Sequence, residues 1–364
     1  MGLKIGIVGL PNVGKSTVFN ALTKAGAAVA NYPFCTIDPN VGIVPVPDAR
    51  LKKLADMYHP KKVTPTAIEF VDIAGLVKGA SEGEGLGNQF LGTIKEVDAV
   101  LYVVRCFEDG NVIHVSGKVD PESDIGIIHT ELCLKDLDTV TTRIQRLEKV
   151  SRTGDKDAKT QLETLKKAAE LLEAGNPIRS GTWTKEDAPV LQELQLLTQK
   201  PVLYCANVKE SELPKGGPFV DVVRAIATKE NSEVVVISGK VEAEVAELPE
   251  DEAILYLKEL GLEEPGLNQL IRAGYKLLGL ITFLTAGEPE VRAWTVKKGS
   301  TAPQAAGVIH SDFERGFIRA EIMRYDDLME LGSQHAVKEK GLYRLEGKEY
   351  IMQDGDVVYF RFNV

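Results

Sequence analysis

The chain has 364 residues, a formal charge of −10 and four cysteines. This length predicts two or three domains rather than one compact core. The negative charge argues against nucleic-acid binding through the overall field and leaves room only for a local basic patch. The cysteines form no C-x-x-C pair, so we expect reduced thiols rather than disulfides or a zinc site. Because no signal-like N-terminus and no apolar run of about 20 residues is present, we expect a cytoplasmic protein without membrane contact.

A strand, a phosphate-binding loop and a helix are predicted at the start of the chain. The apolar run 3–8 indicates a buried strand, and residues 17–22 indicate a helix. Between them, GLPNVGKS (9–16) has the spacing G-x-x-x-x-G-K-S, in which backbone N–H groups and a helix N-terminus surround a phosphate chain. In such a loop Lys15 reaches the β- and γ-phosphates and the Ser16 hydroxyl binds Mg²⁺. We therefore expect a nucleoside triphosphate as the ligand.

Two later segments have the pattern of nucleotide-dependent switches. The loop 30–40 contains Thr36, a candidate Mg²⁺ ligand whose position depends on the γ-phosphate; the alternative is a turn hydroxyl that bonds its own backbone. The apolar run 67–71 ends in D-x-x-G, where Asp72 can hold Mg²⁺ through water and the Gly75 N–H can contact the γ-phosphate. The many glycines up to residue 92 indicate a mobile second switch.

The residue that positions the attacking water is not the usual one. Ras-like switches have Gln after D-x-x-G, but here Leu76 follows. The predicted strand 98–105 leads into a loop that ends in His114, which can reach the water from the nucleotide side. A surface or structural histidine is the alternative.

A helical hairpin is predicted in the middle of the chain. Apolar residues follow a four-three spacing on both sides of the polar break 151–155, at positions 133, 137, 140, 144 and 147 and again at 158, 162, 165, 169 and 172. The stretch 140–167 holds eight basic and four acidic residues. This local excess indicates either an RNA-facing arm or an ordinary solvated helix face.

Two predicted strands, 201–206 and 233–237, end in base-recognition motifs. NVKE (207–210) stands where a GTPase has N-K-x-D, and SGK (238–240) stands where it has S-A-K. Glu210 is longer than Asp by one methylene, which displaces the carboxylate from guanine, and Val208 replaces the lysine that flanks the base. Adenine has neither guanine donor and loses nothing by this change. The motifs indicate an ATP site on a GTPase plan, with Asn207 bonding the base edge.

Five motifs together resemble the YchF family, the Obg-like ATPases. They are GLPNVGKS (9–16), YPFCT (32–36), DIAGL (72–76), NVKE (207–210) and the closing DGD…FRFNV (354–364). The resemblance implies an α/β fold: a P-loop NTPase G domain with a mostly parallel sheet (1–130 and 199–279), a helical coiled-coil insertion (131–198) and a C-terminal β-grasp TGS domain (280–364). It also implies a redox- and ribosome-associated ATPase.

The resemblance assigns the site residue by residue. The phosphates would be bound by Asn12, Val13, Gly14, Lys15, Ser16, Thr17 and Gly75, the base by Asn207, Val208, Glu210 and Ser238, and Mg²⁺ by Ser16, Thr36 and Asp72. His114 and Lys15 would be catalytic, with His114 in place of the absent Gln. Since no arginine finger is identifiable, we also expect Asn12 to bind a monovalent cation, K⁺, beside the phosphates.

The sequence thus predicts a slow ATP-hydrolysing switch, a monomer that binds ribosomes (the large subunit or the 70S particle) in translation or stress regulation, with RNA as a further candidate partner. Three alternatives stay open. One is a GTPase of the same fold, and another is a nucleotide-gated binding module with negligible turnover, because Leu76 holds water poorly. A metabolic P-loop kinase is disfavoured, since no Arg-rich lid is visible and D-x-x-G is a switch pattern.

Overall fold

The computed structural model describes residues 3–27, 40–73, 86–110, 117–151 and 156–363. The chain forms two compact units. The N-terminal unit comprises residues 1–44 and 69–274, and the C-terminal unit comprises residues 45–68 and 275–364. Of the predicted site residues, Thr36, Gly75 and His114 lie outside the described residues, as does Leu76.

The N-terminal unit is built on a six-stranded sheet with the strand order β2-β4-β1-β5-β6-β7. Strand β1 pairs in parallel with β4 and β5, and β6 pairs in parallel with β5 and β7. The central strands β5 and β6 are buried along their whole length, which explains their continuous apolar runs. The strands are β1 (Lys4–Val8), β2 (Val41–Pro45), β4 (Ala67–Asp72), β5 (Ala99–Arg105), β6 (Val202–Asn207) and β7 (Glu233–Ile237).

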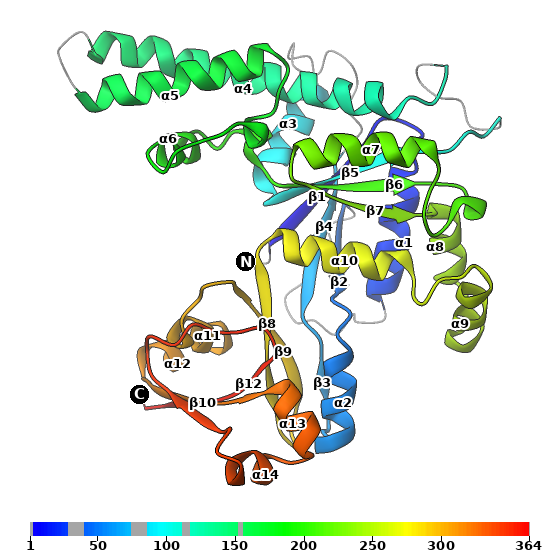
Figure 1. Cartoon of the computed structure of the whole chain (residues 1–364), viewed down its shortest axis with the longest axis vertical. Coiled ribbons are helices and arrows are strands. Elements are labelled where there is room, and N and C mark those ends of the chain that lie inside the picture. Colours follow the sequence, from blue (N-terminus) through cyan, green and yellow to red (C-terminus); the bar gives the residue numbers. More distant parts are fainter. Residues whose placement is uncertain (1–2, 28–39, 74–85, 111–116, 152–155, 364) are drawn as a thin grey trace. The chain divides into compact units, whose positions relative to one another are not determined.

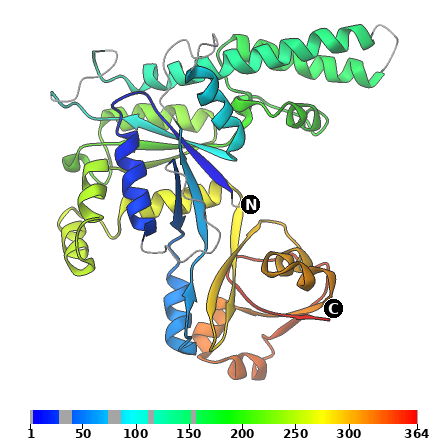
Figure 2. The ribbon, with the colours of Figure 1, turned by 180° about the vertical axis from the view of Figure 1, so that it is seen from behind.

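Helices cover both faces of this sheet, so the predicted G-domain fold is confirmed. Helices α7 and α10 lie in front of the sheet in Figure 1, whereas α1 and α3 lie in front of it in Figure 2. Buried Glu242 of α8 accepts hydrogen bonds from Gly266 N (2.9 Å) and Leu267 N (3.2 Å) and so fixes the start of α10. The helices are α1 (Lys15–Ala27), α3 (Leu86–Glu96), α7 (Pro218–Lys229), α8 (Gly239–Val245), α9 (Glu250–Glu259) and α10 (Gly266–Leu277).

The predicted helical hairpin is present as α4 (Pro121–Ser151) and α5 (Lys156–Glu173), which lie side by side in Figures 1 and 2. All ten apolar positions of the predicted seam belong to one hydrophobic core or pack against it. Helix α4 begins at Pro121, ten residues before the boundary predicted between the G domain and the insertion at residue 131. Its first turns are held in place by Ile125 and Ile128, which are buried at 1% and 2% exposure. The boundary therefore falls inside a helix.

A buried polar network holds the base of this insertion. Arg179, in the 3₁₀ turn Ile178–Ser180, donates to Glu230 Oε2 (2.7 Å) and to the Thr198 carbonyl (3.2 Å), and its Nη2 lies 2.9 Å from His129 Nε2. Burial lowers the pKa of His129 to about 3, so the imidazole is neutral and accepts this bond. Asp136 accepts from the backbone N–H groups of the 3₁₀ turn Leu197–Gln199. The network joins α4 to the end of α7 without using the nucleotide site.

The C-terminal unit contains a second six-stranded sheet, with the order β11-β10-β12-β8-β9-β3. Strand β12 is antiparallel to β10 and parallel to β8, and β8 and β9 form an antiparallel pair, which is the expected β-grasp arrangement. The elements are β3 (Val63–Thr64), β8 (Leu280–Ala286), β9 (Val291–Lys297), β10 (Phe317–Arg324), β11 (Arg344–Glu346), β12 (Asp356–Phe362), α2 (Ala49–Tyr58), α11 (Ala302–Ile309), α12 (Ser311–Arg315), α13 (Tyr325–Leu331) and α14 (Gln334–Glu339).

The predicted division is corrected for residues 45–68, which were assigned to the nucleotide-binding domain and fold with the C-terminal unit. Val63 pairs with Val291 in the sheet, and Leu54 of α2 is buried in the core of this unit. Arg50 bonds Asp48 and Asp354, with 2.7 Å to each carboxylate. The insertion α4–α6 (α6, Asp187–Leu194) belongs to the N-terminal unit, so the structure has two compact units, whereas the sequence predicts three domains.

Three of the four cysteines, Cys106, Cys133 and Cys205, are buried free thiols, as expected. Burial raises the pKa of Cys106 and Cys133 to about 12. Within the described ranges, no helix has the length and the apolar character that a membrane span requires.

Candidate nucleotide-binding site

The loop between β1 and α1 can form only with glycine at two of its positions. A Cβ on Gly9 would lie 2.8 Å from the carbonyl oxygen of Val103, and a Cβ on Gly14 would overlap the side-chain amide of Asn207. Gly14 also has a φ of +95°, which L side chains rarely adopt. Its carbonyl accepts from Val18 N at 3.0 Å, so the loop passes directly into the first turn of α1. The N-terminus of α1 therefore follows the loop as the phosphate-site prediction requires.

Two residues predicted to act on the triphosphate meet in space. Lys15 Nζ, at the start of α1, forms an ion pair with Asp72 Oδ1 at the end of β4. Their side chains are 13% and 21% exposed, so solvent screens the pair only in part. Parallel pairing of β1 with β4 brings them together, because the carboxyl ends of both strands lie at one edge of the sheet. A bound triphosphate would compete with Asp72 for this lysine.

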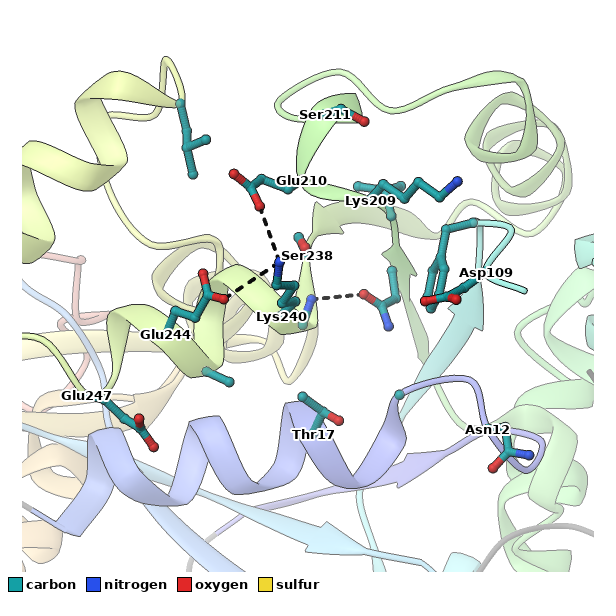
Figure 3. A pocket seen from close by; sticks show the side chains of 17 residues that line it. Asn12, Thr17, Asp109, Lys209, Glu210, Ser211, Ser238, Lys240, Glu244 and Glu247 are labelled. Carbon is teal, nitrogen blue, oxygen red and sulfur yellow. Dashed lines mark hydrogen bonds and ion pairs between the residues drawn. The ribbon is translucent and has the colours of Figure 1, made fainter. Parts of the chain in front are cut away.

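A cavity of about 910 Å³ opens beside the loop, within the size range of small-ligand sites. Figure 3 shows α1 along one side, with Asn12 and Thr17, and the loops after β6 and β7 on the other. The lining residues are Asn12, Gly14, Thr17, Phe107, Asp109, Asn207, Val208, Lys209, Glu210, Ser211, Ser238, Gly239, Lys240, Ala243, Glu244, Glu247 and Leu260.

Asn207 connects the walls of this cavity. Its Nδ2 donates to the carbonyl of Val13 (3.0 Å), and its Oδ1 accepts from the backbone N–H of Gly239 (2.9 Å). Both bonds are buried, and the residue is 5% exposed. A primary amide has a second N–H and a second lone pair, so these bonds leave some capacity for a base. The structure thus adds a positioning role to the predicted base contact.

The end of the cavity that the base motifs form is lined by charge. Lys240 Nζ lies 3.8 Å from Glu210 and 3.8 Å from Glu244, and both pairs are drawn in Figure 3. Glu210 is therefore at the cavity, as predicted, with its carboxylate turned toward Lys240. Val208 lines the cavity but is only 3% exposed, and its backbone N–H donates to Ile237. Its side chain is too buried to flank a base as the GTPase lysine does.

The structure describes eleven of the fourteen predicted site residues. Seven of them line the cavity: Asn12, Gly14, Thr17, Asn207, Val208, Glu210 and Ser238. Val13 is buried behind the loop, and Ser16 is exposed in the first turn of α1. Sequence reasoning missed Phe107, Asp109 and Leu260 as lining residues. Phe107 and Asp109 follow the end of β5, and this position at a strand end could have predicted that they line the cavity. No sequence pattern indicates the same for Leu260.

Comparison with known proteins gives a consistent result along the whole chain. The family of 50S ribosome-binding GTPases matches residues 4–128, and the C-terminal family of YchF GTPases, described as a protein of unknown function, matches residues 280–363. Ribosome-binding ATPase YchF of Bacillus subtilis is 58% identical, and the protein of that name from Haemophilus influenzae is 56% identical; both alignments cover 100% of each chain. The solved structure of the YchF GTPase of Schizosaccharomyces pombe is 42% identical, with a TM-score of 0.89 over 99% of this chain and 98% of that one. The chain belongs to the YchF family.

Proposed function

We propose that this chain is an ATP-binding and ATP-hydrolysing switch that prefers ATP to GTP and binds ribosomes. The observation that carries the proposal is the cavity in which the phosphate loop, through Asn12 and Gly14, meets the altered base motif at Glu210. Lys15 of the same loop pairs with Asp72. The bacterial relatives are named ribosome-binding ATPases, which supports ATP hydrolysis and ribosome binding. The fission yeast relative is named a GTPase, so the base preference rests on the residues of the cavity.

The residues at the phosphate end fit a magnesium–triphosphate ligand. Ser16 and Asp72 offer a hydroxyl and a carboxylate, and hard oxygen donors are those that Mg²⁺ takes. When bound, Mg²⁺ would neutralise charge on the phosphate oxygens. Lys15 would leave Asp72 and bind the β- and γ-phosphates, while the backbone of the loop donates N–H bonds. We also propose that Thr36 binds Mg²⁺, that the Gly75 N–H contacts the γ-phosphate, and that Asn12 binds K⁺ beside the phosphates.

The base preference follows from what the cavity offers to guanine and adenine. Guanine recognition needs a carboxylate that accepts two hydrogen bonds from N1–H and the 2-amino group. Glu210 lies at the right strand end, but its carboxylate is near Lys240 and on a longer side chain than Asp. Adenine presents no donor that needs this carboxylate, so ATP loses no contact in this site. GTP lacks the two hydrogen bonds that an aspartate would accept from guanine, and the site therefore favours ATP.

Replacing Glu210 with Asp, alone and together with Val208→Lys, is expected to shift the ratio of the dissociation constants toward GTP by roughly tenfold, since hydrogen bonds to a charged partner are the stronger kind. Equilibrium titration with both nucleotides measures the ratio. The same substitution at Glu212, two residues on and outside the cavity lining, serves as the control. Because Val208 is buried, the double variant is compared only after its thermal unfolding matches that of the wild type. Tighter binding of GTP than ATP by the wild type would contradict the proposal.

A nucleotide-gated binding module with negligible turnover is the second candidate, because apolar Leu76 cannot hold the attacking water. Sedimentation with ribosomes in ATP, in ADP and in a non-hydrolysable ATP analogue, with phosphate release measured in parallel, separates the two. A switch is expected to sediment differently in ATP and ADP and to release phosphate. Nucleotide-dependent sedimentation without phosphate release would favour the module.

A further inference from the structure

Helix α9 presents an apolar surface that the nucleotide site does not use. Leu255 and Ile254 are 63% and 57% exposed, and Leu248, in the turn before the helix, is 36% exposed. Leu257 of the same helix is buried, at 4% exposure, and anchors α9 to the unit. Exposed apolar side chains that gather in one patch mark interaction sites in many soluble proteins.

Two of these residues, Leu248 and Leu255, line a groove of about 530 Å³ between the end of α8 and one face of α9, here called the α9 groove. Its lining residues on α9 are spaced three and four apart, which places them on one face of the helix. The Tyr256 hydroxyl crosses the groove and donates to Glu244 Oε2 at 2.7 Å. The groove is lined by Glu244, Leu248, Glu252, Leu255, Tyr256 and Glu259.

The segment that forms this groove is strongly acidic. Residues 241–264 contain nine acidic residues and one lysine, a formal charge of −8. Three of these acids pair with cations, Glu244 with Lys240, Glu247 with Lys24 and Glu264 with Arg272, whereas Glu252 and Glu259 line the groove. Glu242 is buried and caps α10, but Glu244, Glu252 and Glu259 face the groove. Such a field repels the phosphates of RNA and of acidic lipids and attracts cations. A second copy of this chain, placed symmetrically on the groove, would bring like charges together.

We propose that the α9 groove docks a basic amphipathic helix of a partner protein. The apolar side of that helix would cover Leu248 and Leu255, and its lysines or arginines would lie against Glu252 and Glu259. This is the helix-in-groove mode of recognition, with charge complementarity that selects the partner and speeds association. The proposal concerns a protein contact and does not depend on which nucleotide the site prefers.

Fluorescence anisotropy tests the proposal on the full-length protein. The probe is a labelled synthetic helix of about four turns, with leucines on one face and lysines on the other. A second peptide has the same composition with its leucines dispersed around the helix. The amphipathic peptide is expected to bind at low salt, more tightly than the dispersed one, and binding should weaken as salt screens the charges.

Two double variants locate the site. Leu248→Ala with Leu255→Ala is expected to weaken binding about tenfold or more, as loss of buried contacts does at other interfaces. Leu345→Ala, which truncates an equally exposed leucine (61%) on β11, should change nothing. Glu252→Gln with Glu259→Gln should weaken binding and flatten its salt dependence, whereas exposed Glu263→Gln, outside the groove, should have a much smaller effect. All these sites are at the surface, so thermal unfolding should match the wild type.

Several results would overturn the proposal. They are no binding of the amphipathic peptide at low salt, equal binding of the dispersed peptide, and wild-type affinity in the leucine double variant. Binding of a single-stranded RNA oligonucleotide that the same double variant abolishes would also overturn it, because the groove would then recognise a different class of partner.

Discussion

Lys15→Ala is expected to lower ATP hydrolysis by about 10²–10³-fold or more, the range seen when one group that stabilises transition-state charge is removed. Lys15 lies at the first residue of α1, beside the glycine loop, and its ammonium already pairs with Asp72. In the nucleotide complex it would neutralise charge that grows on the phosphates during transfer. Neither the backbone amides nor a neutral side chain can replace a full positive charge there.

The same change should leave the fold intact. Asp72 is 21% exposed, so water can solvate its carboxylate once the lysine is gone. Circular dichroism and thermal unfolding check this point alongside phosphate release. Lys24→Ala is the matched control, since Lys24 lies on the same helix, is 54% exposed and pairs with Glu247 at 2.6 Å. Hydrolysis that survives Lys15→Ala unchanged would mean that another site is responsible.

His114→Ala is expected to lower kcat by about 10²–10⁴-fold, with little change in ATP affinity. Leu76 cannot orient water, and the chain from β5 reaches the cavity at Phe107 and Asp109 before it continues to His114. An imidazole that acts on the water contributes to the transition state and not to the ground-state phosphates, so kcat and kcat/KM should fall together.

The control for His114 is His335→Ala in α14, whose side chain is 83% exposed in the C-terminal unit. It should hydrolyse ATP at the wild-type rate. A neutral substitution such as His114→Asn, which can still bond water, should recover part of the lost rate. If His114→Ala hydrolyses ATP as the wild type does, with and without ribosomes, another group positions the water.

Sequence reasoning succeeded where the physical cause is local. The glycine loop between β1 and α1 is predictable because the spacing G-x-x-x-x-G-K-S is typical of a strand, loop and helix in this order. Strands β5 and β6 could be predicted from continuous apolar runs, and the hairpin from positions such as Val140 and Leu165, which both lie in its core. In each case the pattern within a few residues already specifies the environment of the side chain.

Long-range contacts were not predictable in the same way. Nothing within 45–68 indicates that Val63 will pair with Val291, or that Arg50 will bond Asp354, because these partners are far away in sequence. The same holds at the site for Asn207, whose bonds to Val13 and Gly239 become visible only when three strand ends meet. Such contacts depend on tertiary packing, and a pattern within a few residues contains no information about partners that are distant in sequence.

Phosphate release from ATP and from GTP, measured side by side on one preparation of the wild type with Lys15→Ala in parallel, tests the central claim most directly. We expect a higher kcat/KM for ATP than for GTP, and the loss of both activities in Lys15→Ala. A higher kcat/KM for GTP, or ATP hydrolysis that persists in the variant, would contradict it.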